Sequence, residues 1–183
     1  MRVLQEVAYW LTIWPRLKRL KKLLPNAKIY PCGSRYVCNP PVMHTDVDFL
    51  VYSEAGVSRK LEAAGWDNAT WQDYCGNISA DDSFVSWRKG SVNLIVMTSK
   101  RGADRFNVAT HISRAYNIRP KYARVLVYEA LRRHPEWSAI KAWLADYPKL
   151  ITFLENANGA NGNAVIAIYR AQHGLTEEVN DDY

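Results

Sequence analysis

Two aspartates flank a single valine at the start of an apolar run, in the segment DVDFLVY that begins at Asp46. Alternate side chains of a strand point to the same side, so Asp46 and Asp48 are predicted to lie together. Neighbouring carboxylates repel each other unless a cation lies between them, and the ion that suits them is a hard divalent one, Mg²⁺ or Mn²⁺. The pair therefore predicts a metal site at the mouth of a buried strand.

A Gly-Ser pair lies upstream, and Ser34 precedes Asp46 by twelve positions (46 − 34 = 12). Gly33 lets the backbone approach a ligand, and Ser34 offers a hydroxyl and an N–H at a predicted helix start. Such groups hold phosphates. Arg35 follows directly and is a further candidate for phosphate contact, although an arginine that only faces solvent is an equal alternative.

The order of these elements, Gly-Ser after one strand and Asp-x-Asp opening the next, resembles the nucleotidyltransferase superfamily. That superfamily is typified by DNA polymerase beta, kanamycin nucleotidyltransferase and the minimal nucleotidyltransferases. The matching residues are Gly33, Ser34, Asp46 and Asp48, and the ordered pattern extends over about residues 27–97. The resemblance implies an α+β fold, a small mixed β-sheet backed by helices, with a helical C-terminal part. It also implies that Gly-Ser binds nucleoside triphosphate and that both aspartates bind Mg²⁺ and are catalytic.

The sequence departs from the family where a third carboxylate is usual on a later strand, because the segment SVNLIVM has Asn93 there. An amide supplies an oxygen but no charge, and it is not a base. Three accounts stay open. Another carboxylate, such as Asp81, Asp82 or Asp104, replaces it; the protein binds nucleotide without transfer; or the strands are misaligned.

The segment SWRKGSVN, residues 86–93, adds further candidates. Arg88 alternates with Ser86 and is predicted to face the triphosphate or the acceptor, with a solvated strand face as an equal alternative. Arg88 and Asn93 complete the predicted nucleotide-binding set of Gly33, Ser34 and Arg35.

The remaining elements follow from apolar periodicity and from turn residues. Helices are predicted before and after Pro15, over residues 56–64 and from residue 101 onward. Strands are predicted at 27–31 and 46–52, and a hairpin at 84–97. A helix over 138–154 is expected to be interrupted by Pro148, with a linker at 155–163 and a last helix at 164–172. These elements form an α/β core over residues 1–100 and a helical segment, 101–183, packed on that core.

Composition limits the partners. The 183 residues carry a net charge of +6, which suits nucleotides or RNA. Basic helix faces are interpreted first as solvated faces, with RNA contact as the alternative function: Arg16, Lys18, Arg19, Lys21, Lys22, Lys121, Arg124 and Arg132, with Tyr128 near the last three for stacking. Three cysteines without a paired motif favour a reducing cytoplasm. No stretch is apolar over the length of a bilayer, so no membrane partner is expected.

The leading hypothesis is therefore a Mg²⁺-dependent nucleotidyltransferase that moves a nucleoside monophosphate from a triphosphate to an acceptor hydroxyl. The acceptor is open among protein, small molecule and RNA. A catalytically inactive nucleotide- or RNA-binding protein of the same fold is the alternative, and an RNA-binding domain with an incidental Asp-x-Asp is a third.

Overall fold

The computed structural model describes residues 2–69 and 84–121, and then residues 124, 127, 128, 131, 141, 142, 144, 145 and 147–156. The chain divides into two compact units, Met1–Lys121 and Tyr122–Tyr183. The boundary predicted at residue 100 stays a prediction. Residue 100 begins the helix Lys100–Ala115, which lies within the first unit. The predictions for residues 70–83 and 157–183, which include Asp81 and Asp82, lie outside the described residues.

The N-terminal segment is one continuous helical stretch of three parts: α1 (Arg2–Ala8), the π-helical segment η1 (Tyr9–Ile13) and α2 (Trp14–Leu23). Pro15 lies in the first turn of α2, directly after η1. Proline lacks an N–H and cannot continue an α-helical ladder from within, whereas the first turn of a helix tolerates it. The widened turn of η1 thus joins the two α-helices without a break, and Leu17 and Leu20 of α2 are buried.

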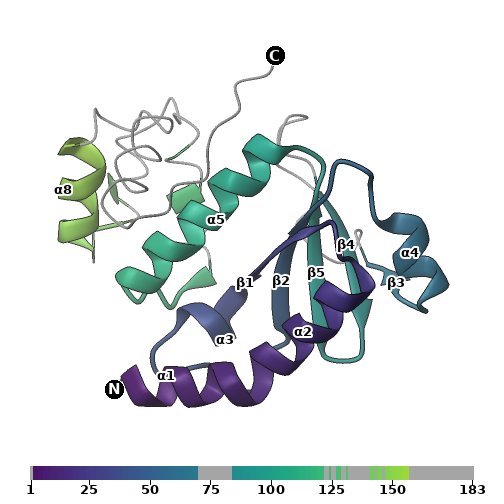
Figure 1. Ribbon diagram of the computed structural model, residues 1–183. Helices are drawn as coiled ribbons and strands as arrows, with labels where there is room; N and C mark the ends of the chain where they lie inside the picture. The colour runs from purple at the N-terminus through teal and green to yellow at the C-terminus, as the bar shows by residue number, and fades with distance from the viewer. Residues whose placement is uncertain are drawn as a thin grey trace. The chain divides into compact units, whose positions relative to one another are not determined.

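Five strands form one mixed sheet (Figure 1): β1 (Lys28–Cys32), β2 (Val47–Tyr52), β3 (Asp67–Asn68), β4 (Phe84–Lys89) and β5 (Val92–Met97). Their order is β1-β2-β5-β4-β3. β2 and β5 run parallel, and the other neighbouring pairs are antiparallel. The predicted α+β class with a small mixed sheet is confirmed, and the predicted hairpin is the β4–β5 pair.

One face of the sheet, here called the apolar face, is built from alternate residues such as Val47, Phe49 and Val51 of β2. Their side chains share a core with Leu17 and Leu20 of α2 and with residues of α4 (Ser58–Ala63). All three β2 side chains are essentially inaccessible to water. Burial of this face, at about 25 cal/mol per Å² of apolar surface, is the main force that holds α2 and α4 on the sheet.

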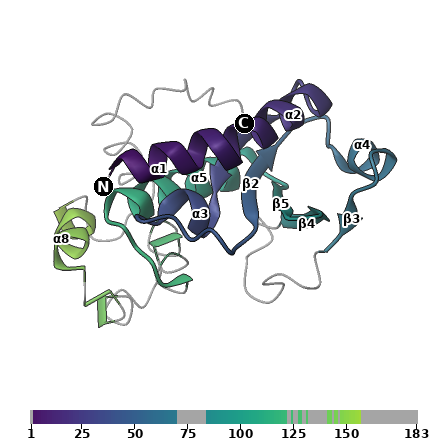
Figure 2. The same cartoon turned by 90° about the horizontal axis from the view of Figure 1, so that it is seen from below.

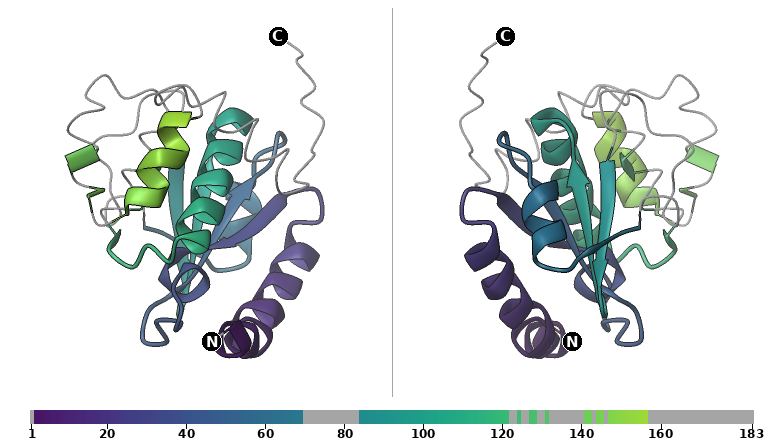
Figure 3. Two further views of the ribbon diagram at one scale, coloured as in Figure 1. Left: turned by 90° about the vertical axis from the view of Figure 1, so that its left-hand side faces the viewer. Right: turned by 90° about the vertical axis from the view of Figure 1, so that its right-hand side faces the viewer.

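The opposite face, here called the site face, is made by the intervening residues and is covered differently. Leu50 and Met97 pack with Ala103 of α5 (Lys100–Ala115) toward one end of the strands. Figure 3 shows α5 and α2 on opposite sides of the sheet. Figure 2 shows the short helix α3 (Gly33–Val37) beside α5, and these two helices are in contact. The polar residues of the site face, Asp48, Asn93 and Arg88, lie toward the other end of the strands.

In the second unit, α8 (Pro148–Asn156) is described. Pro148 was predicted to interrupt the helical stretch over 138–154, and this is confirmed: helical residues 141 and 142 are followed by a turn at 144 and 145, and α8 begins anew at Pro148. A proline at the first helical position loses no hydrogen bond. None of the helices in the described part of the chain is both long and apolar enough to cross a membrane.

Candidate functional site

Three residues from three neighbouring strands form a row on the site face. Asp48 of β2 is paired with Asn93 of the parallel strand β5. Asn93 is in turn paired with Arg88 of the antiparallel strand β4. Residues paired in register share a face of the sheet, so the Asp48, Asn93 and Arg88 side chains lie next to one another. The structure thereby brings together residues that were predicted from two separate segments of the sequence, DVDFLVY and SWRKGSVN.

The amide of Asn93 is oriented by two hydrogen bonds. Its Nδ2 donates to Oδ1 of Asp48 at 3.1 Å, and its Oδ1 accepts from Oγ of Ser86 at 3.0 Å. Asn93 is 6% exposed and Ser86 is 0% exposed, so water does not compete for these bonds. Asn93 therefore turns its NH₂ group, and not its oxygen, toward the carboxylate.

Ser86 is a site residue that sequence reasoning did not select. Its alternation with Arg88 placed it on the correct strand face, and that was the one available signal. Ser86 lies opposite Ile95 and diagonally across from Asn93, a relation that depends on the register of β4 against β5. The register is a property of the folded sheet, and the spacing of residues does not reveal it.

Gly33 touches the carboxylate of Asp48 through its backbone. The preceding residue, Cys32, is paired with Asp48 in the β1–β2 ladder. A Cβ atom on Gly33 would lie 2.6 Å from Cγ of Asp48 and closer still to Oδ2. The φ angle of Gly33 is +71°, in the left-handed region that favours glycine. Glycine is thus required here both by the backbone angle and by space. Ser34 follows it in the first turn of α3.

Asp46 lies just before β2, where the backbone N–H of Val47 donates to the carbonyl of Ser91 in the β4–β5 turn at 2.9 Å. Asp46 and Asp48 both act on the guanidinium of Arg35. Burial and the neighbouring Arg16 lower the pKa of Arg35, while Asp48 and Asp46 act in the opposite direction. Both carboxylates therefore lie close enough to Arg35 to interact with the same positive charge.

Arg35 also holds the loop that leads to Asp46. Its Nη2 donates to the carbonyl oxygen of Met43 at 2.6 Å and to that of Thr45. In the described part of the chain, the buried Nε of Arg35 meets no hydrogen-bond acceptor. The phosphate contact predicted for Arg35 stays a prediction, and what the structure shows is that Arg35 anchors residues 43–45.

Asn117, which follows α5, forms two hydrogen bonds with the backbone of the same loop. It accepts from the N–H of Asn39 at 2.7 Å and donates to the carbonyl of Asn39 at 2.9 Å. Arg119 adds a bond from Nη1 to the carbonyl of Pro40 at 3.1 Å. Asn117 and Asn39 are 78 positions apart, so nothing in the sequence pointed to this contact.

The acidic residues fit one divalent ion. Asp46 and Asp48 offer the oxygen ligands that Mg²⁺ prefers, and Mg²⁺ is commonly bound by one or two carboxylates with water and phosphate oxygens as the other ligands. No group of three or more His, Cys, Asp or Glu side chains suited to a metal occurs among the described residues. Asn93 does not supply a further ligand in this orientation, because its oxygen is bonded to Ser86. The fit is therefore to one ion, since the described residues do not add a further carboxylate to this pair.

The other carboxylate considered for the third position, Asp104, lies elsewhere. Asp104 contributes to the raised pKa of Tyr52, after burial and Glu54. Tyr52 is the last residue of β2 and is four residues, or roughly 13 Å of strand, from Asp48. Asp104 thus lies near the far end of the strand. Tyr128, predicted to stack on RNA, is buried.

No protein-family model matches the sequence, and no curated protein matches it. Among solved structures, the chain is similar to the conserved protein GrpB from Enterococcus faecalis, with 14% identity over 90% of this chain and 92% of the other, and a TM-score of 0.43. It is also similar to terminal uridylyl transferase 4 from Trypanosoma brucei with bound dUTP, with 16% identity over 94% of this chain and a TM-score of 0.36. A third is the Cid1 poly(U) polymerase, with 19% identity over 62% of this chain and a TM-score of 0.33. The chain covers 56% and 36% of those two enzymes.

Proposed function

We propose that this protein is a nucleotidyltransferase that uses a nucleoside triphosphate with Mg²⁺ or Mn²⁺. The acceptor hydroxyl oxygen forms a bond to the α-phosphorus, and the bond from that phosphorus to the bridging oxygen of the β-phosphate breaks. Pyrophosphate leaves, and the hydroxyl proton passes to solvent. The observation that carries the proposal is the close approach of Gly33 to the carboxylate of Asp48, which places a phosphate-binding type of turn against a metal-binding type of side chain.

Asp46 and Asp48 are the residues that would hold the ion. A bound divalent ion would offset the charge of the phosphates as the bond to pyrophosphate breaks. The lack of a side chain at Gly33 lets the carboxylate of Asp48 lie directly against this turn, and the hydroxyl of Ser34, one residue later, would donate to phosphate oxygens. The glycine is essential for this arrangement, because any side chain at residue 33 would collide with the carboxylate of Asp48.

Arg35 and Arg88 supply the positive charge that a triphosphate requires. The buried Nε–H group of Arg35 would donate a hydrogen bond to a phosphate oxygen, since it has no acceptor among the described residues. Arg88 lies in the row with Asn93 and Asp48, on the side of Asn93 away from Asp48. Guanidinium groups bind phosphate with two parallel hydrogen bonds, so each arginine would orient as well as attract the nucleotide.

A second function, nucleotide binding without transfer, is favoured by the hydrogen bonds of Asn93. A neutral amide with its oxygen bonded to Ser86 neither accepts a proton nor adds charge for a second ion. In this alternative, the protein holds the nucleotide and its ion through the same residues, and the acceptor hydroxyl is not activated.

Titration calorimetry with each nucleoside triphosphate, with and without Mg²⁺, tests the shared premise. We expect Mg²⁺-dependent binding that Asp48→Asn weakens by roughly tenfold or more, because a ligand charge of the ion is lost. Glu62→Gln, on the exposed side of α4, is the matched control and should bind as the unaltered protein does. Equal binding by Asp48→Asn and the unaltered protein would exclude the proposed role of Asp48.

Transfer of an α-³²P label to added RNA, protein or small hydroxyl compounds then separates the two functions. Label transfer that is lost in Asp48→Asn supports the transferase. Mg²⁺-dependent binding without label transfer to any acceptor class supports the binding protein.

A further inference from the structure

Six large apolar side chains on the N-terminal helical segment are exposed to solvent. Their exposed fractions range from 39% for Trp14 to 71% for Leu11, and the set is Val3, Leu4, Val7, Trp10, Leu11 and Trp14. Elsewhere in the described residues, the single exposed large apolar side chain is Met43. Scattered exposed apolar residues need no explanation, but six within twelve positions form a contiguous apolar surface of the kind that marks an interaction site.

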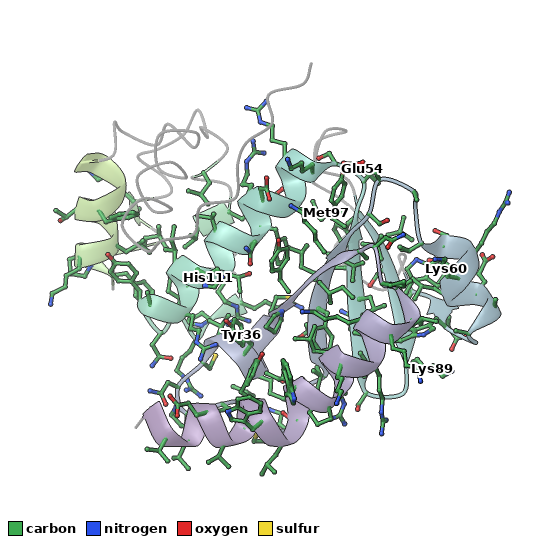
Figure 4. All side chains as sticks on the ribbon, in the orientation of Figure 1. Tyr36, Glu54, Lys60, Lys89, Met97 and His111 are labelled. Atoms are coloured by element: carbon green, nitrogen blue, oxygen red, sulfur yellow. The ribbon has the colours of Figure 1, made fainter. Side chains whose placement is uncertain are left out.

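These six side chains, here called the outer stripe, recur every three or four residues and so share one side of the helical segment. Ile13, Leu17 and Leu20 occupy the other side and are buried in the core of the apolar face. Figure 4 shows side chains of α1 projecting away from the sheet. The two tryptophans of the outer stripe are packed edge to face, with ring centroids 5.2 Å apart. The stripe is therefore preorganised and directed outward.

Charge is concentrated on the same segment. Residues 1–24 contain six basic residues and one acidic residue, a net charge of +5 out of +6 for the whole chain. Four of the basic side chains are exposed on α2, directly after the outer stripe: Lys18, Arg19, Lys21 and Lys22. The remaining 159 residues (183 − 24 = 159) thus carry a net charge of only +1.

We propose that the outer stripe and these four basic residues bind the surface of a membrane that contains anionic lipids. The helical segment would lie in the plane of the surface, with the aliphatic side chains and tryptophans at the boundary of the acyl chains and the basic side chains against phosphate and carboxylate headgroups. The expectation of no membrane partner was based on the lack of an apolar stretch long enough to span a bilayer. That criterion does not apply to a helix that lies in the plane of the membrane surface.

The composition of the stripe distinguishes this partner from two others. RNA would use the tryptophans and the basic residues, but it offers nothing apolar to Val3, Leu4, Val7 and Leu11. A second copy of the chain that paired through the same segment would bury the apolar residues, but it would bring a net charge of +5 against the basic residues of α2. A bilayer with anionic lipids satisfies both parts of the surface.

Co-sedimentation of the full chain with vesicles provides the test. We expect binding to phosphatidylcholine vesicles that contain about 30% phosphatidylserine, and roughly tenfold weaker binding to pure phosphatidylcholine. On binding to the anionic vesicles, the tryptophan fluorescence of the unaltered protein should shift to shorter wavelength. Leu4→Glu combined with Leu11→Glu should reduce this binding roughly tenfold or more and abolish the shift. Both substituted side chains are exposed, so melting temperature is expected to be retained and is measured alongside.

Two matched controls belong to the same experiment. Met43→Glu changes the exposed apolar residue outside the stripe, and Arg59→Glu with Lys60→Glu reverses exposed charges on α4, a helix that contributes no residue to the proposed surface. Both should bind vesicles as the unaltered protein does, whereas Lys18→Glu with Lys22→Glu should not. Asp48→Asn should also bind normally, because Asp48 belongs neither to the outer stripe nor to the four basic residues.

Three results would overturn the proposal. The first is equal sedimentation with and without vesicles. The second is a dimer, seen by analytical ultracentrifugation, that Leu4→Glu with Leu11→Glu dissociates; it would make the stripe an interface between copies. The third is binding of single-stranded RNA, with no vesicle binding, that is lost when Trp10 and Trp14 are replaced by alanine.

Discussion

The two faces of the sheet are made by alternate residues of the same strands, yet they serve different ends. On β2, Val47, Phe49 and Val51 face a continuous apolar core, whereas Asp48 faces Asn93 and the turn at Gly33. The apolar face is covered by α2 and α4. The site face has an apolar half under α5 and a polar half that keeps partly exposed carboxylates.

The difference between the two faces indicates which side chains stabilise the fold and which form the candidate site. Side chains of the apolar face contribute through the area they bury, and their chemical identity matters mainly through volume and shape. Side chains of the polar half contribute through directed bonds to named partners, so a change of one atom has a specific consequence. Substitutions on the two faces should therefore separate stability from nucleotide binding.

The largest expected effect is on the apolar face. Phe49→Ala removes a fully buried ring and should lower the free energy of unfolding by about 3–5 kcal/mol, because the cavity cannot close completely. Urea denaturation measures the loss, and the affinity of the folded fraction for nucleotide should be unchanged. A loss of nucleotide affinity by the folded Phe49→Ala protein would contradict the separation of the two faces.

Gly33→Ala should affect both properties. Alanine at a φ of +71° costs about 1–2 kcal/mol, and its Cβ would in addition displace the carboxylate of Asp48. The control is Gly56→Ala, since Gly56 has a φ of +70° and no atom lies within 4 Å of the position that its added methyl group would take. Both variants should lose similar stability from the backbone, and Gly33→Ala alone should also lose nucleotide affinity by calorimetry. Equal affinity in the two variants would show that the contact with Asp48 is unimportant.

Asn93→Asp tests whether the ion binds beside the row formed by Asp48, Asn93 and Arg88. A carboxylate at residue 93 would replace the donated bond to Asp48 with repulsion, so that the metal-free protein should lose about 1–2 kcal/mol of stability. Added Mn²⁺ should restore that loss and raise the melting temperature more than in the unaltered protein, because a further charged ligand is present. Asn93→Ala removes the bond without adding charge and should show no such response. No gain with Mn²⁺ in Asn93→Asp would place the ion away from this row.

Ser86→Ala should have the smallest effect. It removes the hydrogen bond to Oδ1 of Asn93 and should cost about 1 kcal/mol of stability. Because both residues belong to one hydrogen-bond chain, the double variant with Asn93→Ala should lose less than the sum of the two single losses. Additive losses would indicate that the two side chains act independently.

Much of the site was accessible from residue types and local spacing. The strands around Asp48 and Asn93 were predicted because apolar alternation and turn residues are local signals, and Gly33 and Asp48 were paired by their order in the chain. The roles of Ser86 and Asn117 were not, because each depends on a partner placed by the register of the sheet or by the return of the chain after α5. The continuity of the N-terminal helical stretch through Pro15 also required the structure, since a π-helical turn has no sequence signature of its own.

By itself, the sequence determined the elements and the residue types that could do chemistry, since backbone preference and apolar periodicity are properties of neighbours along the chain. Tertiary structure alone decided that the amide of Asn93 donates to Asp48, that Arg35 secures the loop before Asp46, and that one side of the N-terminal helix is left exposed. These features depend on the distance between segments that meet only after folding, and burial of the apolar face is what brings them together.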